Sequence, residues 1–521
     1  MGSYDERNDS LKHKHVRYEY PTITEMLDKT SVGRDGQYLF LEERKNGRRV
    51  TFDRWRQDLL ETAGRFQQHS AKHIGVVCDL TYECILCMYA VIVAGKVLVS
   101  LEADLSADTL KRYVEKADID LLLFHDGMID PDADCCERMR IPDFLAIPAE
   151  VLKQWPRWDG SRDACIFFTS GTEGEPYGVL LTQRNLGFIN SYSGYHRLSR
   201  SPRILAYLPL YHVFSFAALT VCIHDGCQVH LSRSIKYLAQ DLQKVKPDLL
   251  TTVPMVNEVL CSKIRKGIDD SGMGKKIYDL VRLSNGLRKI GIDLRTPVFR
   301  KLRESFGGIP QLIITSGSAA SLTSMEFFDD FGIVLLQVYG MTETTVAVSS
   351  NTLERNRKGS VGQPLWFNQV RIRDGEIQIR GDNIMKGYYK APQATERAFD
   401  DGWLRTGDLG YFDADGYLYI TGRKKNLIIL DSGENVSAEE LEMQLLQFSF
   451  IAEVVVGERN KRIHAQIIAQ PQPDMDEEAL KKAIQEEIDK LNCQNPLYKR
   501  IVSWELRKEP FEKTSSLKIR R

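Results

Sequence analysis

A run of small and hydroxyl residues follows an apolar segment near residue 170. Residues 167–179 read Phe-Phe-Thr-Ser-Gly-Thr-Glu-Gly-Glu-Pro-Tyr-Gly-Val. Glycines allow backbone N–H groups to approach an oxyanion closely, and serine and threonine hydroxyls add further donors. The apolar residues 163–168 predict a strand that carries the loop to a sheet edge, where phosphate groups are commonly held. Loops of this composition also form plain turns, so the segment alone favours phosphate binding without establishing it.

Five further segments carry residues suited to nucleotide and acyl chemistry. They are Leu208-Pro-Leu-Tyr-His212, Tyr339-Gly-Met-Thr-Glu343, Arg405-Thr-Gly-Asp408, Gly422-Arg-Lys-Lys425 and Lys513-Thr-Ser-Ser-Leu-Lys518. Together with the loop they resemble, in content and order, the motifs of the acyl-adenylate-forming superfamily, which includes acyl-CoA synthetases, non-ribosomal adenylation domains and firefly luciferase. The resemblance runs from residue 163 to the last residues, and residues 51–109 resemble the superfamily's N-terminal subdomain.

The resemblance implies a two-step reaction that uses ATP, Mg²⁺ and either CoA or a phosphopantetheine carrier protein. A carboxylate attacks the α-phosphorus of ATP and expels pyrophosphate, and the acyl group then passes to a thiol. Because both reactants of the first step are anionic, the site must neutralise charge and hold them in line. It therefore needs a phosphate cradle, a divalent cation, a cation near the bridging oxygen and groups that hold the nucleoside.

Most of these requirements are assigned by the resemblance to specific residues. The phosphate cradle is assigned to Thr169, Ser170, Gly171, Thr172 and Gly174, and the magnesium ligands are assigned to Glu343 and Thr172. The nucleotide site is assigned to Gly317, Ser318, Ala319, Tyr339, Gly340, Thr342, Asp408 and Arg423. In it, Tyr339 would stack on adenine, Thr342 would touch the α-phosphate, and Asp408 would accept hydrogen bonds from the ribose hydroxyls.

Four more residues are assigned to catalysis and to a mobile lid. Lys518 would place its ammonium on the carboxylate and the bridging oxygen, which is worth about 3 kcal/mol. Lys425 falls on the hinge of the lid, and Gly433 falls in the loop that meets pantetheine. His212 would line the acyl pocket and move aside for the thiol, with a core histidine as the alternative.

Three positions depart from the superfamily pattern. Glu173 stands where a small hydroxyl residue is common, Tyr177 replaces the usual lysine, and Leu517 replaces the usual glycine. A phenol cannot replace an ammonium as a phosphate partner, so we expect tighter dependence on Mg²⁺ or weaker ATP binding. The alternative is that the side chains of Glu173 and Tyr177 point into solvent and matter little.

The acid is expected to lack an α-amine. Adenylation domains for amino acids carry an aspartate where this chain has Ala217, and an ammonium without that partner would be desolvated unpaired. Phe214, Phe216 and Leu219 suit an apolar pocket, although their spacing also suits a core. A fatty acyl-CoA ligase is the first hypothesis. A free-standing enzyme that loads a carrier protein is the second, and a degenerate acyl-adenylate binding protein is the third.

Composition limits the other classes of function. The chain has 521 residues and a formal net charge of −1. No overall positive charge would therefore attract nucleic acid or anionic lipid, although this balance allows a local basic patch. The pair Cys84 and Cys87 lies in an apolar helical pattern, which favours core cysteines over a redox or metal pair. The scattered cysteines and the lack of a transmembrane pattern suggest a reduced, cytoplasmic setting.

Hydrophobic patterning predicts an α/β fold. Strand-like residues 72–78, 97–101, 119–124, 203–208 and 312–316 alternate with helical patterns. Residues 1–15 are expected to be disordered, and 16–423 to form an N-terminal AMP-binding domain of two parallel-sheet subdomains. That domain would end in a small β-barrel-like subdomain at about 359–423, where Asp374-Gly375 predicts a hairpin. Residues 424–521 would form a small α+β lid, with a capping box at Ser437–Glu440.

Overall fold

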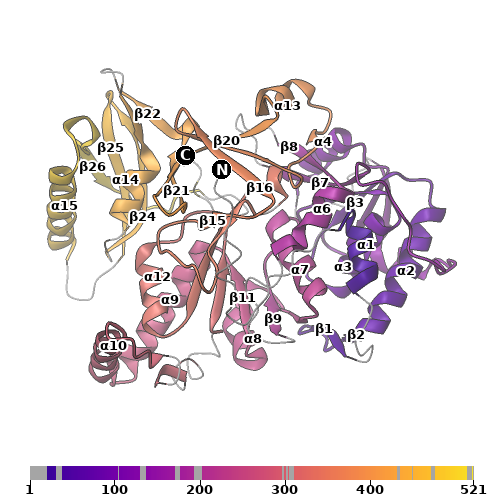
Figure 1. Cartoon of the computed structure of the whole chain (residues 1–521), viewed down its shortest axis with the longest axis horizontal. Helices are drawn as coiled ribbons and strands as arrows, with labels where there is room; N and C mark the ends of the chain where they lie inside the picture. Colours follow the sequence, from indigo (N-terminus) through magenta and orange to yellow (C-terminus); the bar gives the residue numbers. More distant parts are fainter. Residues whose placement is uncertain are drawn as a thin grey trace.

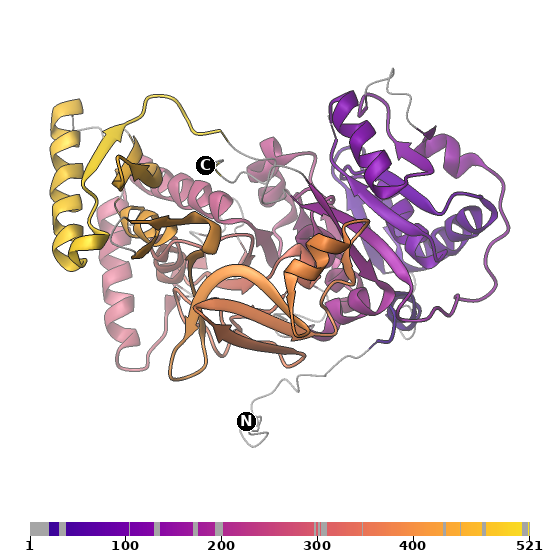
Figure 2. The same cartoon turned by 90° about the horizontal axis from the view of Figure 1, so that it is seen from above.

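The computed structural model describes most of the chain. The described residues are 20–30, 38–103, 105–129, 136–169, 176–192, 202–295, 298–300, 303, 310–345, 347–430, 434–446, 448, 450–470, 476–512 and 519. Alternating strands and helices build two large sheets from the N-terminal part (Figure 1). The C-terminal elements, drawn in yellow, lie at the opposite end of the molecule from the first helices (Figure 2).

One large sheet has seven strands in the order β18-β8-β7-β4-β3-β5-β6. Its strands are β3 (His73–Val77), β4 (Val97–Leu101), β5 (Leu121–Phe124), β6 (Glu137–Arg140), β7 (Asp163–Thr169), β8 (Tyr177–Thr182) and β18 (Gly387–Tyr388). The strands from β7 to β6 are parallel, whereas β8 and β18 run antiparallel to their neighbours. The apolar runs that predicted strands near 72–78, 97–101, 119–124 and 163–168 are therefore confirmed.

The other large sheet has nine strands in the order β15-β14-β13-β12-β11-β9-β10-β1-β2. They are β1 (Leu39–Glu43), β2 (Arg49–Thr51), β9 (Arg203–Ala206), β10 (Gln228–Leu231), β11 (Leu249–Thr252), β12 (Leu312–Thr315), β13 (Val334–Tyr339), β14 (Ser349–Ser350) and β15 (Gln363–Pro364). The six central strands are parallel, and the antiparallel pairs lie at the edges. The strands near 203–208 and 312–316 are also confirmed.

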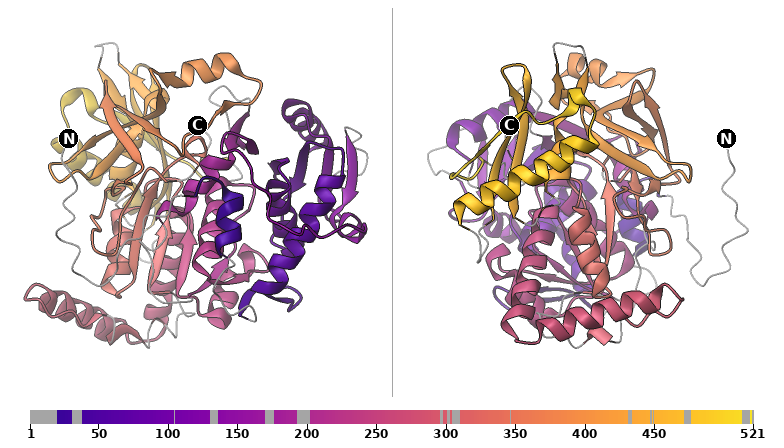
Figure 3. Two further views of the ribbon diagram at one scale, coloured as in Figure 1. Left: turned by 45° about the vertical axis from the view of Figure 1, so that its right-hand side comes forward. Right: turned by 90° about the vertical axis from the view of Figure 1, so that its left-hand side faces the viewer.

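Helices of the N-terminal part pack on these sheets. They are α1 (Ile23–Thr30), α2 (Phe52–Gln68), α3 (Tyr82–Val93), α4 (Ala107–Ala117), α5 (Ile141–Ala146), α6 (Gln183–Gly187), α7 (Val213–Asp225), α8 (Leu238–Val245), α9 (Pro254–Asp270), α10 (Gly274–Arg288) and α12 (Leu322–Asp330). Short 3₁₀ turns occur at η2 (Phe188–Tyr192), η3 (Ile235–Tyr237) and η4 (Thr342–Thr344). Figure 3 shows α10 along the outer edge of the molecule.

Helix α3 joins the two sheets in one core. It is apolar on nearly all sides, which predicts burial, and Cys84 and Cys87 are both fully buried in it. Its Tyr89 ring stacks on Phe216 of α7 with 5.1 Å between centroids. After the helix, Gly95 has a φ of +75°, and a Cβ there would lie 2.5 Å from the Trp158 ring. The predicted core cysteines are confirmed, and the helix has to end at a glycine.

The β-rich part that follows is a five-stranded antiparallel sheet. Its strands are β16 (Asn368–Arg373), β17 (Glu376–Gly381), β19 (Phe399–Asp400), β20 (Trp403–Phe412) and β21 (Leu418–Arg423), and α13 (Pro392–Ala398) precedes β19. Asp374 and Gly375 both have positive φ, as the predicted hairpin requires. Strand β20 pairs with β17, β19 and β21. In the described strands no pairing of β16 with β21 closes this sheet into a barrel.

The C-terminal elements have a core of their own. They are η5 (Lys424–Asn426), β22 (Leu427–Ile429), β23 (Asn435–Ser437), α14 (Ala438–Leu445), β24 (Ile451–Arg459), β25 (Arg462–Ala469), α15 (Glu477–Gln494), η6 (Leu497–Lys499) and β26 (Ser503–Leu506). Ser437 caps α14 by accepting from the Glu440 N–H. The Glu440 carboxylate pairs with Lys499, so only the serine half of the predicted capping box is seen. Within the described part of the chain, no helix has the length and apolarity to cross a bilayer.

Candidate nucleotide and acyl site

The predicted site segments gather at the carboxyl ends of parallel strands. His212 follows β9, residues 317–319 follow β12, and Tyr339 ends β13, all in the nine-stranded sheet. Thr169 ends β7 in the seven-stranded sheet. Ligands of open α/β sheets bind at this edge, so the topology places the motifs where a ligand is expected.

Asp408 is the best-defined residue of the site. It lies opposite Arg423 in the β20–β21 pair, and its Oδ1 accepts from Arg423 Nε at 2.8 Å. Its Oδ2 accepts from the Tyr339 hydroxyl at 2.8 Å. Burial, and then the Asp408 charge, raise the pKa of Tyr339 well above its ordinary value, so the phenol stays protonated as a donor. Three predicted nucleotide residues from distant parts of the chain are thus directly bonded.

Glu343 is buried beside this group. It lies in η4, and its Oε1 accepts from the Tyr388 hydroxyl at 2.9 Å. Burial raises the pKa of Glu343 above its ordinary value, although the bond from Tyr388 opposes the shift. A buried carboxylate without a bonded cation is a group whose charge a divalent ion would stabilise. The side chain therefore fits the predicted magnesium ligand.

Tyr177 links Thr169 of the predicted cradle to Tyr388, the hydrogen-bond partner of Glu343. Its backbone pairs with Thr169 across β7 and β8, and its ring packs on Tyr388 with 5.0 Å between centroids. The alternative that Tyr177 points into solvent is wrong, because the side chain is half-buried against Tyr388. The cradle residues Ser170, Gly171, Thr172 and Gly174 lie outside the described residues, as does Glu173.

The remaining nucleotide residues line the same edge. Gly317 has a φ of +97°, and Gly317, Ser318 and Ala319 are exposed after β12. Gln337 of β13 fixes this turn, because its Nε2 donates to the Ser318 carbonyl and its Oε1 accepts from the Ala320 N–H, each at 3.3 Å. Gly340 and Thr342 are partly exposed between β13 and Glu343.

The predicted acyl region begins at His212. This half-buried residue precedes α7, and its ring contacts Tyr211 with 4.4 Å between centroids. The hydroxyl of Tyr211 donates to Glu102, which follows β4, at 3.1 Å. A mainly apolar cavity of about 20 Å³, with room for about one water molecule, lies between α7, β9 and β11, and Leu219 is among its lining residues.

The sequence left three apolar residues open between pocket and core, and the structure packs all of them against other apolar residues. Phe216 is fully buried against Tyr89, and Leu219 belongs to the same buried core, although it also lines the small cavity. Phe214 is half-buried and packs on the apolar cluster of α8 and α9. Ala217 is buried within α7, and its methyl side chain provides no partner for an ammonium.

The junction with the C-terminal elements follows Arg423. Lys425 is exposed in η5, whereas Gly433 and the whole segment 513–518, with Leu517 and Lys518, lie outside the described residues. Gly422 packs tightly at this junction, because a Cβ there would lie 2.1 Å from Ser437 Oγ. Ser437 Oγ also donates to the Thr421 carbonyl at 2.7 Å, so β21 and α14 are fastened together.

Two known protein families match the regions of the chain that contain these motifs. The AMP-binding enzyme family matches residues 28–389, and the AMP-binding enzyme C-terminal domain matches residues 425–521. The first match alone covers more than half of the chain. The chain belongs to the AMP-binding enzyme family.

Two curated relatives of this AMP-binding enzyme are ligases of long-chain fatty acids. The long-chain-fatty-acid–CoA ligase FadD15 of Mycobacterium bovis is 33% identical over 343 residues, which cover 62% of this chain and 57% of the ligase. The chloroplastic long-chain-fatty-acid–[acyl-carrier-protein] ligase AEE15 of Arabidopsis thaliana is 29% identical over 403 residues, which cover 64% of this chain and 55% of the ligase. The matches thus span little more than half the length of either relative.

Solved structures show the same fold. The o-succinylbenzoate CoA synthetase MenE of Bacillus subtilis, in complex with its acyl-adenylate, gives a TM-score of 0.74 at 22% identity. The alignment covers 95% of this chain and 96% of the synthetase. The α/β architecture expected from the sequence is therefore confirmed.

Sequence reasoning missed two residues of this AMP-binding enzyme site. Tyr388 holds Glu343, but 45 positions separate the two residues and no local pattern links them. Glu376 is buried, and its carboxylate accepts from the Gly407 N–H at 3.0 Å and lies 3.3 Å from Lys424 Nζ. It thus supports the turn before Asp408. The predicted hairpin at Asp374-Gly375 was enough to place Glu376 at the start of a strand. It did not indicate that Glu376 would contact Gly407 and Lys424.

Proposed function

We propose that this AMP-binding enzyme activates a carboxylic acid with ATP and transfers the acyl group to a thiol, with CoA as the acceptor. The observation that carries the proposal is the bonded group of Tyr339, Asp408 and Arg423 beside the buried Glu343. Such a group offers a carboxylate for ribose hydroxyls, an aromatic face for a base and a second carboxylate for a metal ion.

The residues of the group have distinct roles in this proposal. Asp408 accepts from the ribose hydroxyls, and Arg423 keeps its carboxylate ionised and oriented. Glu343 and Thr172 hold Mg²⁺, which supplies charge neutralisation for the phosphates. Thr169 and the loop after it cradle the phosphates, and Gly317, Ser318 and Ala319 lie along the nucleotide and acyl groups.

The acyl transfer requires a second set of residues. Lys518 would stabilise the charge that develops on the carboxylate and bridging oxygen during adenylation. Residues 424–521 form the lid in this proposal, with the hinge at Lys425 and with Gly433 meeting the pantetheine arm. His212 lines the entry to the acyl pocket and moves aside for the thiol.

A fatty acid is the proposed substrate. Ala217 leaves no carboxylate to pair with an α-ammonium, which favours an acid without an α-amine. The printed activities of FadD15 and AEE15, both of which act on long-chain fatty acids, support the same class. A carrier protein is the alternative acceptor, because AEE15 is named for transfer to acyl carrier protein.

The test is pyrophosphate exchange with a panel of acids. The purified chain, ATP and Mg²⁺ are mixed with labelled pyrophosphate and fatty, aryl or amino acids, and label in ATP is measured. Exchange with fatty acids and none with amino acids is expected. Addition of CoA or an acyl carrier protein then identifies the acceptor from the thioester formed. ATP binding without exchange for any acid would overturn the proposal and favour a degenerate binding protein.

A further inference from the structure

Helix α10 and the residues at its two ends expose large apolar side chains. Leu280, Leu283 and Ile290 are 44%, 60% and 72% exposed. Leu280, Leu283 and the half-buried Leu287 lie at intervals of three and four residues, which places them along one side of α10, whereas the exposed Met273 directly precedes the helix and Ile290 follows it in a turn. These five residues are called the apolar ridge. It follows a helix about 22 Å long at the outer edge of the molecule (Figure 3).

Among the described residues, the packing of α10 depends on another side of the helix. Helix α10 packs on the protein through a neighbouring side, where Ile277, Val281 and Ser284 are buried. Ile277 and Val281 belong to the same apolar cluster as residues of α9 and α12. The helix therefore has more apolar surface than its packing requires, and the surplus faces outward.

Basic residues flank the ridge. Residues 271–300 contain seven lysines and arginines but only two acidic residues, in a chain whose formal net charge is −1. Lys275, Lys276 and Lys289 are exposed. The two acidic residues are engaged locally, since Asp279 pairs with Arg282 at 3.2 Å and Asp293 with Arg295 at 2.6 Å. Arg282, Arg288 and Arg295 are each paired with a carboxylate, and the exposed Asp269 and Asp270 directly precede the segment. The positive charge beside the ridge therefore comes from Lys275, Lys276 and Lys289.

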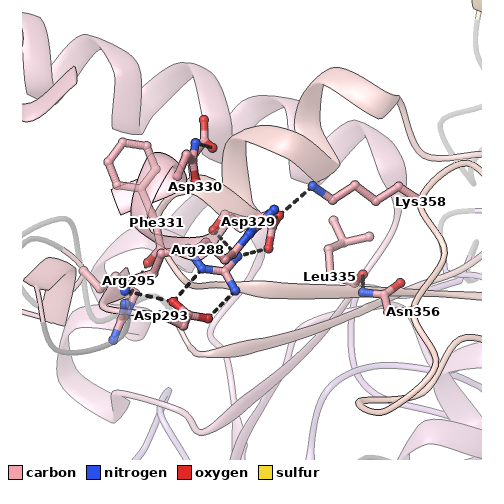
Figure 4. Close-up of polar contacts among 11 residues, drawn as sticks. Arg288, Asp293, Arg295, Asp329, Asp330, Phe331, Leu335, Asn356 and Lys358 are labelled. Carbon is pink, nitrogen blue, oxygen red and sulfur yellow. Dashed lines mark hydrogen bonds and ion pairs between the residues drawn. The ribbon is translucent and has the colours of Figure 1, made fainter. Parts of the chain in front are cut away.

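Asp329 holds the far end of α10 in place (Figure 4). Its carboxylate pairs with Arg288 at 2.9 Å, with Lys358 at 2.6 Å and with Arg295. Burial acts to raise its pKa, but the bonds from Lys358 and Arg288 outweigh burial and hold the pKa below its ordinary value. The next residue, Asp330, accepts from Asn285 at 2.7 Å. The ridge is therefore fixed on α12 before any partner arrives, which lowers the entropy lost on docking.

We propose that the apolar ridge and its lysines dock this chain onto the surface of an anionic lipid bilayer. A helix that lies in a membrane interface combines an apolar side with flanking lysine and arginine, and it needs no membrane-spanning segment. A protein partner that covered the ridge would be expected to supply acidic residues where a bilayer supplies phosphates. The experiment distinguishes a protein partner from a bilayer. The inference goes beyond the proposed function and does not rest on it, because lipid binding is measured without ATP or acid.

The test is co-sedimentation of the full chain with vesicles. Phosphatidylcholine vesicles with phosphatidylglycerol are compared with phosphatidylcholine alone, at about 0.1 M salt and again at about 0.5 M salt. Binding to the anionic vesicles that weakens at high salt is expected. The double substitution Leu283→Ser with Ile290→Ser should lower the partition coefficient about tenfold or more, because both side chains would lose their contact with the acyl region.

Matched controls distinguish a specific effect of the ridge from a general effect of surface hydrophobicity or charge. Leu497→Ser with Val502→Ser removes equally exposed apolar side chains of the C-terminal part, and it should leave binding unchanged. Lys275→Glu with Lys289→Glu should weaken binding to anionic vesicles, whereas Lys111→Glu with Lys153→Glu should not. Thermal unfolding of each variant verifies the fold.

Three results would overturn the proposal. The first is no binding of the wild type to anionic vesicles, and the second is equal binding by wild type and ridge variants. The third is self-association that the ridge substitutions abolish while vesicle binding is absent, which would assign the ridge to a protein partner.

Discussion

Two buried carboxylates of the site stand in different electrostatic situations. Asp408 has a cation and a hydroxyl as bonded partners, whereas the bonded partner seen for the Glu343 side chain is the hydroxyl of Tyr388. The raised pKa of Glu343 follows from its burial. A buried carboxylate with a raised pKa is typical of functional sites, and we therefore expect Glu343 to serve activity at a cost in stability.

Glu343→Gln should remove activity without lowering stability at neutral pH. A carboxyl group whose folded pKa is raised contributes its stability below the unfolded pKa and loses it as the pH rises through the folded pKa. At about pH 7.5 the ionised wild-type side chain is thus unfavourable, and the amide should raise the free energy of unfolding by about 1 kcal/mol or leave it unchanged. Thermal unfolding from about pH 4 to pH 8 measures the difference, which should shrink toward the acidic end.

The same variant should lose pyrophosphate exchange by about a hundredfold or more. Asp408→Asn serves as the contrast, because it weakens a bonded ion pair and should lower both activity and stability. A Glu343→Gln variant that is clearly less stable than wild type at neutral pH would contradict this account of the carboxylate.

Tyr388→Phe should raise the magnesium requirement. The hydroxyl that orients Glu343 is lost while the ring against Tyr177 stays, so the carboxylate is less well placed for a metal ion. Partners that orient a metal ligand are commonly worth tenfold or more in affinity, and we expect about a tenfold higher Mg²⁺ concentration for half-maximal exchange. Tyr389→Phe is the control, since the hydroxyl of Tyr389 bonds to Asp118 at 2.9 Å on the surface. Equal shifts in both variants would exclude a specific role for Tyr388.

Elements with a strong local signal were the most predictable part of the fold. The all-apolar pattern of α3 and the Asp374-Gly375 turn each determine a structure within a few residues, and both were predicted correctly. Strand β18 was not predictable, because it consists of two residues that pair with β8 more than 200 positions earlier. The three partners of β20 likewise depend on contacts between distant segments. Tyr388 and Glu376 were not predicted for the same reason. The resemblance to the superfamily, by contrast, was enough to assign Asp408 and Arg423 to one site, and the structure pairs them.

His125 joins three elements of the seven-stranded sheet. It follows β5 and pairs with Asp79, which follows β3, at 3.0 Å and with Glu83 of α3 at 3.3 Å. Asp79 and then Glu83 raise the pKa of His125 to about 9. The stability that this charge contributes is complete below the unfolded pKa of about 6.5 and is lost as the pH rises through 9.

His125→Gln should therefore destabilise the chain most at mildly acidic pH. The loss in melting temperature relative to wild type should be largest near pH 6 and should fall steadily up to about pH 9. Thermal unfolding at several pH values measures it, with His73→Gln as a control histidine at the start of β3. A loss that does not change with pH would mean that His125 acts through packing and not through its charge.

At the scale of the whole molecule, two bodies of structure meet at one junction. The large sheets share a core, and the C-terminal elements have their own. Tight contact between Gly422 and Ser437 fastens the start of the C-terminal part to β21, next to the predicted nucleotide residue Arg423. A rotation of the C-terminal part about Lys425 would break this contact, including the Ser437–Thr421 hydrogen bond, and would present another face of that part to the site. The Asp408–Arg423 pair lies within β20 and β21 and would stay in place. One nucleotide site could in this way serve two successive reactions.

Lys518→Ala tests this division of labour, because the two reactions would need different faces of the C-terminal part. Adenylation requires a cation near the carboxylate and the bridging oxygen, so the variant should lose about a hundredfold or more in adenylate formation. Transfer of the acyl group from supplied acyl-adenylate to CoA forms no such charge at that position and should continue near the wild-type rate. Single-turnover assays of the two steps measure this difference, and Lys508→Ala controls for loss of a lysine near the end of the chain. Equal losses in both steps would mean that Lys518 supports the fold or the binding of both substrates. Such a result would contradict a rotation that brings different faces of the C-terminal part to the site.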